Sequence, residues 1–409
     1  MSFAASRLSV VQPSASAAVS QKAKALKAAG QDVIDLGLGE PDFDTPAHII
    51  EAAHDAALGG QTRYPPTDGT AALKAAICAK FSRENGLTFD PSEVLVGNGA
   101  KQVIFDALMA TLEPGDEVLL CAPYFGQYKD MVLVLGGTPV VLRCPSETGF
   151  RVLPGQLEAA ITPKTRWIIL NHPSNPAGSI YTDAELRALG RVLQHHGHVL
   201  VMSDEIYEHI LFDGAVFSSF VAANPELRDR TLTVNGVSKA YAMTGWRIGY
   251  GAGPQALIKA MTIVQSQISS GACSVAQAAA AAALDGPQED VSRFRAAFES
   301  RRDLVVARVA DIDRLSLDPP EGAFYALIGC SGCIGMFTPQ GQKLDTDIDV
   351  TQYLLEHALV AAVPGSAYDL SPFFRISTAS SEATLNEALT RIATAVADLK
   401  PSNQIEYRP

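Results

Sequence analysis

The chain has 409 residues, of which 47% are hydrophobic and 19% are charged, and its formal net charge is -12. This length exceeds the size at which a single core stops growing, so we expect a globular protein of two lobes. The acidic balance argues against nucleic acid or an anionic membrane as a partner, because such a surface repels polyanions, and a small anionic substrate must then be met by locally placed Arg or Lys.

The six cysteines do not form a disulfide framework at this length. Cys330 and Cys333 make a CxxC pair, but no second pair follows at zinc-ribbon spacing, so we expect no metal site. The alanine-rich run at 278–283 is too short for a membrane span. Because the N-terminus lacks an apolar signal core, we expect a cytoplasmic protein.

The first third of the chain predicts two helices, a strand and a further helix. Thr45 is the expected N-cap of a helix that stops at Gly59, and a second helix follows over 70–86. Residues 93–97 predict a short strand that leads through Gly99 into another helix. A strand, a glycine turn and a helix start can bind an anion, because free amides and the positive end of the dipole face the turn; a plain tight turn is the alternative.

Further strands are expected over 117–121, 140–142 and 167–170. The last of these opens onto the rigid turn NHPSNPAG at 171–178, whose asparagine amides fall where ligands bind in open α/β sheets. A capping box then predicts a helix beginning at Thr182.

Another apolar strand, 199–202, is followed by Asp204 and Tyr207. An acid in this place lies at the carboxyl edge of the sheet, where it can meet a ligand; a helix N-cap is the alternative role for Asp204.

The strand 231–234 ends in a polar turn that carries Ser238 and Lys239, with Arg247 further along. In a dry pocket a lysine loses part of its preference for the charged form, so its amine can attack an aldehyde to form a Schiff base. Ser238 and Arg247 can hold a phosphate, and pyridoxal 5'-phosphate (PLP) offers both groups. Taken alone, an ordinary surface lysine after a strand is by far the commoner explanation of this stretch, so other parts of the chain must supply the decision.

The alternation of strand and helix up to Gly286 predicts an α/β fold with a mostly parallel sheet sandwiched by helices. Beyond it the pattern changes to a long charged helix, two short strands and a closing helix, which indicates a smaller α+β domain. We therefore expect an N-terminal segment, 1–44, that joins the small domain, a large domain over 45–286 and the small domain over 287–409.

The polar signals all fall at strand ends on one edge of one sheet. Four stretches carry a resemblance over nearly the full length: GEPDFDTP from Gly39, the turn from Asn171, SDEIYEH from Ser203 and SKAYAMTGWRIGY from Ser238. In these stretches the sequence resembles class I aminotransferases of PLP fold type I, in particular the bacterial aspartate aminotransferase subgroup that includes aspartate/prephenate enzymes.

The resemblance implies PLP as cofactor of the large domain and a role for each matching residue. Lys239 would hold the cofactor as a Schiff base and shuttle a proton. Asp204 would pair with the pyridinium nitrogen, which keeps the ring able to draw electrons. Tyr207 and Asn175 would hydrogen-bond the phenolic oxygen, and Phe125 would stack on the ring.

The resemblance also implies a phosphate site formed by Gly99, Ala100, Ser238 and Arg247. Tyr64 would join it from a partner subunit, so we expect a homodimer with shared active sites.

For the substrate, the resemblance implies that Arg375 forks the α-carboxylate, assisted by Gly39 and Asn175. Lys101, beside the cofactor, would read a second, distal carboxylate. We therefore predict amino transfer between an acidic L-amino acid, aspartate or glutamate, and a 2-oxo acid, working ping-pong through pyridoxamine phosphate.

Three residues depart from the subgroup and leave the acceptor open among 2-oxoglutarate, glyoxylate, prephenate and aromatic oxo acids. Phe125 replaces the usual stacking tryptophan, Gln12 replaces a lysine of prephenate-using relatives, and His172 replaces Ser or Pro in the asparagine turn. His172 either packs there or lines the pocket.

Three other classes of protein are alternatives to an aminotransferase, and each has a feature that distinguishes it. A PLP lyase or decarboxylase on the same scaffold would differ in its products from aspartate. A PLP-sensing transcriptional regulator would need a DNA-binding domain, for which we expect no room before the fold. A dinucleotide site at Gly249, Gly251 and Gly253 lacks the helix start and ribose-reading acid of that motif.

Overall fold

The computed structural model describes residues 3–11 and 14–401. Its core is a seven-stranded sheet in the order β2-β8-β7-β6-β5-β3-β4. The strands are β2 (Val94–Gly97), β3 (Glu117–Ala122), β4 (Thr138–Arg143), β5 (Thr165–Asn171), β6 (Leu200–Asp204), β7 (Thr231–Gly236) and β8 (Gly249–Ala252). Only β8 opposes its neighbours β7 and β2, so the expected mostly parallel sheet is confirmed.

Helices cover both faces of this sheet, and the alternation of buried side chains decides which face each helix covers. On β5, Trp167 and Ile169 pack in one cluster, whereas Ile168 and Leu170 pack in another on the opposite face. The first cluster includes α4 (Ala100–Thr111), α5 (Gln127–Val134) and α9 (Gln255–Ile268). The second includes α6 (Pro154–Ala160), α7 (Asp183–Gln194) and α8 (Phe220–Ala223).

A third cluster covers the β2–β8 end of the sheet with α2 (Ala47–Leu58), α3 (Ala71–Asn85) and α10 (Ser274–Asp285). Thr70 caps α3 and Gly86 ends it in the left-handed conformation, as expected. The expected N-cap of α2 is wrong by one residue, because Pro46 takes that position. The Thr45 hydroxyl is engaged elsewhere: it donates to the Ala242 carbonyl at 2.7 Å and accepts from Trp246 Nε1 at 3.0 Å.

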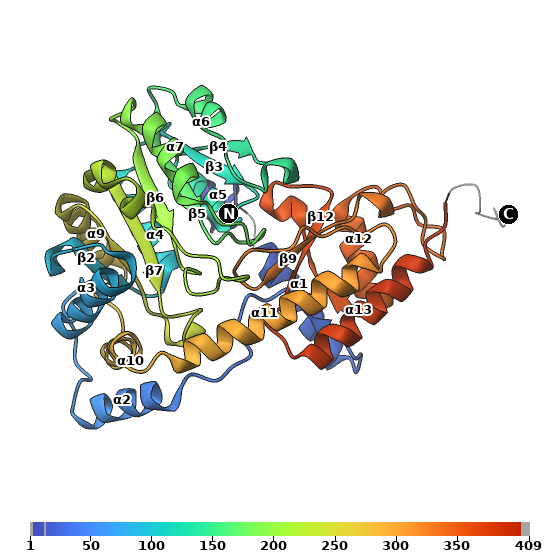
Figure 1. Ribbon diagram of the computed structural model, residues 1–409, viewed down its shortest axis with the longest axis horizontal. Coiled ribbons are helices and arrows are strands. Elements are labelled where there is room, and N and C mark those ends of the chain that lie inside the picture. The colour runs from blue at the N-terminus through green and yellow to red at the C-terminus, as the bar shows by residue number, and fades with distance from the viewer. Residues whose placement is uncertain (1–2, 12–13, 402–409) are drawn as a thin grey trace.

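The smaller α+β part has a three-stranded antiparallel sheet in the order β11-β12-β9. Its core also includes α11 and α13, and α11 extends from beside the large sheet to the small one (Figure 1). A separate two-stranded pair joins the N-terminal β1 to β10. The elements are β1 (Ile34–Asp35), β9 (Tyr325–Gly329), β10 (Val360–Ala361), β11 (Val363–Pro364), β12 (Phe373–Ser377), α1 (Ala15–Ala28), α11 (Glu289–Ala310), α12 (Asp347–Tyr353) and α13 (Glu382–Ala397).

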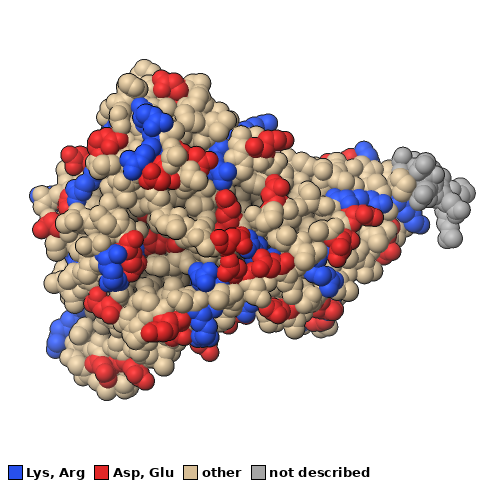
Figure 2. All heavy atoms as spheres, in the orientation of Figure 1, with Lys and Arg blue, Asp and Glu red and all other residues tan. Residues whose placement is uncertain are grey.

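Charged groups of both signs are interspersed over the face of the molecule drawn in Figure 2. All six cysteines are free thiols. Among the described residues, no helix has both the length and the apolar character needed to cross a bilayer.

The glycines of β8 let α4 pack directly onto the sheet. A Cβ on Gly249 would lie 2.1 Å from the Ala100 amide nitrogen, and one on Gly251 would lie 2.7 Å from Val103 Cγ1. Both approaches are closer than any side chain tolerates, so only glycine fits. Helix packing therefore accounts for these glycines, and the close contact fixes the position of the first turn of α4.

We predict that Gly249→Ala lowers the free energy of unfolding by about 3 kcal/mol, because the added methyl group overpacks the contact with α4. The measurement is urea-induced unfolding of the cofactor-free protein. Gly155→Ala in α6 is the control, because its Cβ meets nothing within 4 Å and should stabilise the helix slightly. Equal unfolding midpoints for the two variants would contradict the prediction.

Candidate active site

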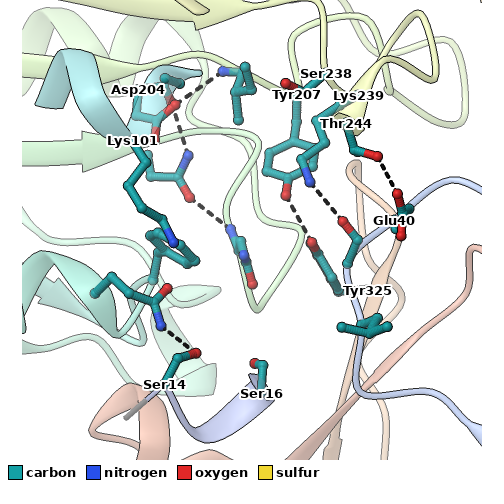
Figure 3. A pocket seen from close by; sticks show the side chains of 18 of the residues that line it. Ser14, Ser16, Glu40, Lys101, Asp204, Tyr207, Ser238, Lys239, Thr244 and Tyr325 are labelled. Carbon is teal, nitrogen blue, oxygen red and sulfur yellow. Dashed lines mark hydrogen bonds between the residues drawn. The ribbon is translucent and has the colours of Figure 1, made fainter. Parts of the chain in front are cut away.

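A cavity of about 450 Å³ opens at the carboxyl edge of the large sheet, between that sheet and the smaller part. Its lining combines residues that follow β5, β6 and β7 with residues of α1, α4, β9 and β12. Figure 3 shows Lys239, Asp204 and Lys101 directed into this space from different elements. The cavity has the size of a small-molecule site and converging polar groups, as binding sites do.

Lys239 extends from the turn after β7 and lines the cavity. Its Nζ donates to the Gly39 carbonyl at 2.7 Å. Burial, and next the positive charge of Arg375, lower the pKa of this amine to about 8. At pH 7 about a tenth of the amine is therefore neutral, far more than for an ordinary lysine, and the neutral form is the nucleophile.

Asp204 ends β6 and is 5% exposed. Tyr128 Oη donates to its Oδ2 at 2.5 Å, and the Ile206 amide donates to its Oδ1 at 3.2 Å. Burial raises the pKa of Asp204 to about 6, although the Tyr128 hydrogen bond opposes that rise. The carboxylate is thus ionised at neutral pH and faces the cavity; it caps no helix among the described elements.

Tyr207 and Gly39 are held together by Tyr325 of β9. The Tyr207 and Tyr325 hydroxyls lie 2.9 Å apart, and both rings are buried (Figure 3). A Cβ on Gly39 would lie 2.0 Å from Tyr325 Oη, so the chain must carry glycine there. The Gly39 carbonyl accepts the hydrogen bond from Lys239 Nζ, so the close packing of Gly39 against Tyr325 also fixes the position of the lysine amine.

The first turn of α4 and Arg247 together have the chemistry of an anion site. Gly99, at φ +86, is the N-cap and supplies no side chain, so no side chain caps the amides of Ala100 and Lys101, whereas the Gln102 amide donates to the Gly99 carbonyl at 3.0 Å. Arg247 donates to the Thr244 carbonyl at 2.9 Å and to the Asn98 carbonyl at 3.2 Å. A Cβ on Gly99 would come within 2.4 Å of Arg247 Nη2, which shows how closely the guanidinium approaches this turn.

Arg375 of β12 is 3% exposed and also lines the cavity. Its guanidinium donates to Asn175 Oδ1 at 2.9 Å and to the Gly37 carbonyl at 2.7 Å. The guanidinium carbon also lies 4.4 Å from the centroid of the Tyr325 ring. Its buried Nε has no hydrogen-bond partner in the described structure. A guanidinium with an unused donor suits a carboxylate ligand.

Lys101 and Phe125 line the same wall of the cavity. Lys101 Nζ lies over the Phe125 ring, 5.3 Å from its centroid. Burial, followed by the charge of Arg247, lowers the pKa of Lys101. Ala100 and Ser238 also line the cavity, so the structure brings most of the predicted site residues together.

Comparison with known proteins agrees with this geometry. Residues 31–392 match the aminotransferase class I and II family. The chain belongs to this family.

Two curated relatives and one solved structure illustrate the similarity. The aspartate aminotransferase of Rhizobium meliloti (strain 1021) is 53% identical over 96% of this chain and 95% of its own length. The aspartate/prephenate aminotransferase of Cereibacter sphaeroides (strain ATCC 17029 / ATH 2.4.9) is 53% identical over 96% of this chain and 98% of its own length. A crystal structure of the Rhizobium meliloti aspartate aminotransferase superposes with a TM-score of 0.95, at 52% identity, over 98% of this chain and all of that chain.

Among the described residues that were singled out from the sequence, Tyr64 and His172 do not line the cavity, and Gly99 only precedes the lining residue Ala100. Tyr64 is 91% exposed and lies by a separate surface pocket, so a contribution across a dimer stays a prediction. His172 is fully buried, stacks on Phe217 at 5.0 Å, and has a pKa lowered to about 4 by burial, which favours packing over ligand binding. Gln12 lies outside the described residues.

Sequence reasoning missed several residues of the site. Tyr128 and Tyr325 were hidden because one sits inside a helix and the other inside a short strand, where an aromatic residue usually signals core. Asn171 was visible as the first asparagine of its turn; its Nδ2 donates to the Asp204 carbonyl at 3.0 Å and its Oδ1 accepts from the Asn175 amide at 2.8 Å. Ser14 and Ser16 from the start of α1 also line the cavity.

We predict that Lys239→Met raises the stability of the cofactor-free protein by about 2 kcal/mol at pH 7, because a desolvated ammonium is removed; solvent in the cavity limits the gain. The native pKa of about 8 lies below the ordinary 10.5, so between these values the native state binds fewer protons than the unfolded state. Wild-type stability then rises with pH, and the advantage of the variant shrinks above pH 8.

The measurement is urea-induced unfolding from pH 7 to pH 10 for both proteins. Lys259→Met on the exposed face of α9 is the matched control and should change little. A constant difference across this pH range would show that the amine is not desolvated.

Proposed function

We propose that this protein is a PLP-dependent aminotransferase that exchanges an amino group between an acidic L-amino acid, aspartate or glutamate, and a 2-oxo acid. The observation that carries the proposal is the convergence, in one cavity, of the Lys239 amine, the Asp204 carboxylate and the Arg375 guanidinium. The names of the relatives, aspartate and aspartate/prephenate aminotransferase, support the same activity.

The residues of the cavity fit PLP. The uncapped amide of Ala100, the turn at Gly99 that leaves room in front of it, and Arg247 beside them suit a phosphate group. Phe125 offers a flat aromatic face to the cavity, and the buried Asp204 carboxylate, which also lines it, suits a protonated ring nitrogen. The Lys239 amine makes a single hydrogen bond, which leaves donors for a ligand, and Arg375 lines the same cavity.

When bound, PLP supplies an aldehyde that condenses with amines and a ring that withdraws electrons from the α-carbon of the amino acid. Lys239 Nζ, held by the Gly39 carbonyl, moves the proton on and off that α-carbon as a general base and acid. Asp204 would keep a proton on the ring nitrogen, and Tyr207 and Asn175 would donate to the phenolic oxygen. Ser238 would join Arg247 in holding the phosphate.

The substrate is oriented by its carboxylates. Arg375, fixed by Asn175 and the Gly37 carbonyl, presents its remaining donors to the α-carboxylate. Gly39 closes the adjacent wall with its backbone. Lys101, whose amine is directed into the cavity, takes the distal carboxylate of aspartate or glutamate (Figure 3).

The acceptor remains open among 2-oxoglutarate, glyoxylate, prephenate and aromatic oxo acids. Phe125 has a smaller aromatic face than the tryptophan usual at this position, so it leaves more space in the cavity beside the cofactor ring. A panel of oxo acids offered to the aminated enzyme, read from the absorbance of the bound cofactor, would rank them.

Further predictions from the sequence belong to this proposal. The exposed Tyr64 side chain supports a homodimer in which it reaches the partner's phosphate site. We propose the division into segment 1–44, large domain 45–286 and small domain 287–409, and the pairing of β1 with β10 supports joining the N-terminal segment to the small domain. The cytoplasmic location stays a prediction.

The proposed function predicts that the purified protein binds PLP with a visible absorbance band, and that borohydride reduction attaches the cofactor to the peptide containing Lys239. Lys239→Ala should abolish both the attachment and turnover. Mass spectrometry of the reduced peptide is the measurement. A label on any other residue, or undiminished turnover by Lys239→Ala, would overturn the proposal.

Product analysis with aspartate separates transfer from other reactions of the same cofactor. Oxaloacetate, the oxo acid of aspartate, with one amino group delivered per acceptor, is the expected result. Alanine with carbon dioxide would indicate a decarboxylase instead.

We predict that Lys101→Ala lowers kcat/KM for aspartate about 30-fold, which corresponds to about 2 kcal/mol, because the distal carboxylate loses its cation. Alanine has no distal carboxylate, so its kcat/KM should change less than about threefold. Steady-state kinetics with both donors is the measurement, and Lys129→Ala, whose amine pairs with Asp369 outside the cavity, is the control. Equal losses for both donors would refute this role.

A further inference from the structure

One buried hydroxyl beside the cavity has no part in the functions proposed so far. Tyr128 lies in the first turn of α5, is 1% exposed and lines the cavity. Its ring packs in the cluster that includes Trp167 and Met202, a role that phenylalanine would fill equally well. The hydroxyl, however, donates to Asp204 Oδ2 at 2.5 Å, so it contacts a buried carboxylate that lines the cavity.

The contacts of Asp204 give this hydroxyl a specific effect. Oδ1 accepts from the Ile206 amide at 3.2 Å and Oδ2 accepts from Tyr128, so each carboxylate oxygen has one donor from the protein. Each oxygen has two acceptor positions, and one position on each stays open toward a ligand. Two donors from different elements fix both the plane of the carboxylate and its rotation.

Tyr128 also contacts the aromatic wall of the cavity. Its amide donates to the Phe125 carbonyl at 2.9 Å, and the two rings meet edge to face with centroids 5.4 Å apart. The same residue thus contacts both the Asp204 carboxylate and the Phe125 ring, two groups that line the cavity. These two groups are the ones that would touch the nitrogen and the face of a bound pyridine ring.

We propose that Tyr128 is a positioning residue that keeps Asp204 ionised and aimed at the ring nitrogen of the cofactor while its ring edge sets the tilt of Phe125. This inference rests on the proposed function. A hydrogen bond to a carboxylate stabilises the charged form, so losing it makes the carboxylate more basic. A more basic Asp204 draws the shared proton from the ring nitrogen toward itself.

The test compares wild-type protein with Tyr128→Phe, each loaded with PLP labelled with ¹⁵N in the ring, by ¹⁵N NMR. In the variant we expect the ring-nitrogen signal to move toward the deprotonated position and kcat to fall about tenfold. KM for aspartate should change less than about twofold, because Arg375 and Lys101 keep their contacts. A ring-nitrogen signal identical to that of the wild type would overturn the inference.

Tyr124→Phe is the matched control. Tyr124 is 3% exposed and its hydroxyl also donates to a carboxylate, that of Asp369, but it does not line the cavity. Its removal should leave the ring-nitrogen signal unchanged. An equal shift in both variants would show that the effect is general loosening of this segment, and would overturn the inference.

A second variant covers the case in which Tyr128→Phe does not retain the cofactor. Replacing Tyr128 with 3-fluorotyrosine keeps its shape but makes the hydroxyl a stronger donor, so the ring-nitrogen signal should move opposite to the direction expected for phenylalanine. An unchanged signal would again overturn the inference. If the wild-type protein itself takes up no PLP at Lys239, the proposed function fails, and the role of Tyr128 fails with it. If the wild-type protein binds PLP but the ring-nitrogen signal is the same in the variants, only the role of Tyr128 is refuted.

Discussion

The hydrogen bond from Lys239 Nζ to the Gly39 carbonyl is the contact around which the site is built. It joins the turn after β7 to the N-terminal segment, 200 residues away along the chain. Gly39 in turn must lack a side chain, because the hydroxyl of Tyr325 on β9 occupies the space a Cβ would need. Three remote segments therefore have to meet before the amine is held in place, and the low pKa of the amine follows from the burial they create.

The parallel register of the sheet aligns the other groups. Asn171 at the end of β5 is paired with Asp204 at the end of β6, and Asp204 is paired with Val234 of β7, just before Lys239. Polar residues that follow these strands therefore come out side by side at one edge, as carboxyl ends of parallel strands do. The antiparallel β8 adds the glycines that bring the start of α4, and with it the anion site, to the same edge.

This alignment explains how much could be predicted from the sequence. An apolar run followed by an acid, an asparagine turn or a lysine carries enough local signal to place Asp204, Asn175 and Lys239 on one edge. The same local signals predicted the capping box at Thr182 and the long charged helix that became α11.

What the sequence could not predict depends on contacts between distant segments. Thr45 has the composition of an N-cap, yet its hydroxyl is held by the loop after Lys239, so a tertiary contact overrode the local preference. The two-residue strands β10 and β11 are too short to show a periodic pattern. Tyr128 and Tyr325 have ordinary core rings, and only the three-dimensional arrangement reveals what their hydroxyls contact.

The chain has a net negative charge, yet its cavity is proposed to bind anions. The positions of the Lys and Arg side chains explain how both can hold. With a net charge of -12, long-range attraction does not bring a dicarboxylate to the protein, so binding has to come from short-range contacts. The cavity supplies them through Lys101, Arg247 and Arg375, which are spread along its walls. Because each acts within a partly enclosed space, where water screens charges less than at the surface, each can favour one anionic group at one position. With Arg247 assigned to the cofactor phosphate, the proposed selectivity for a substrate with two carboxylates depends on the spacing of Lys101 and Arg375, and it is independent of the sign of the surface around them.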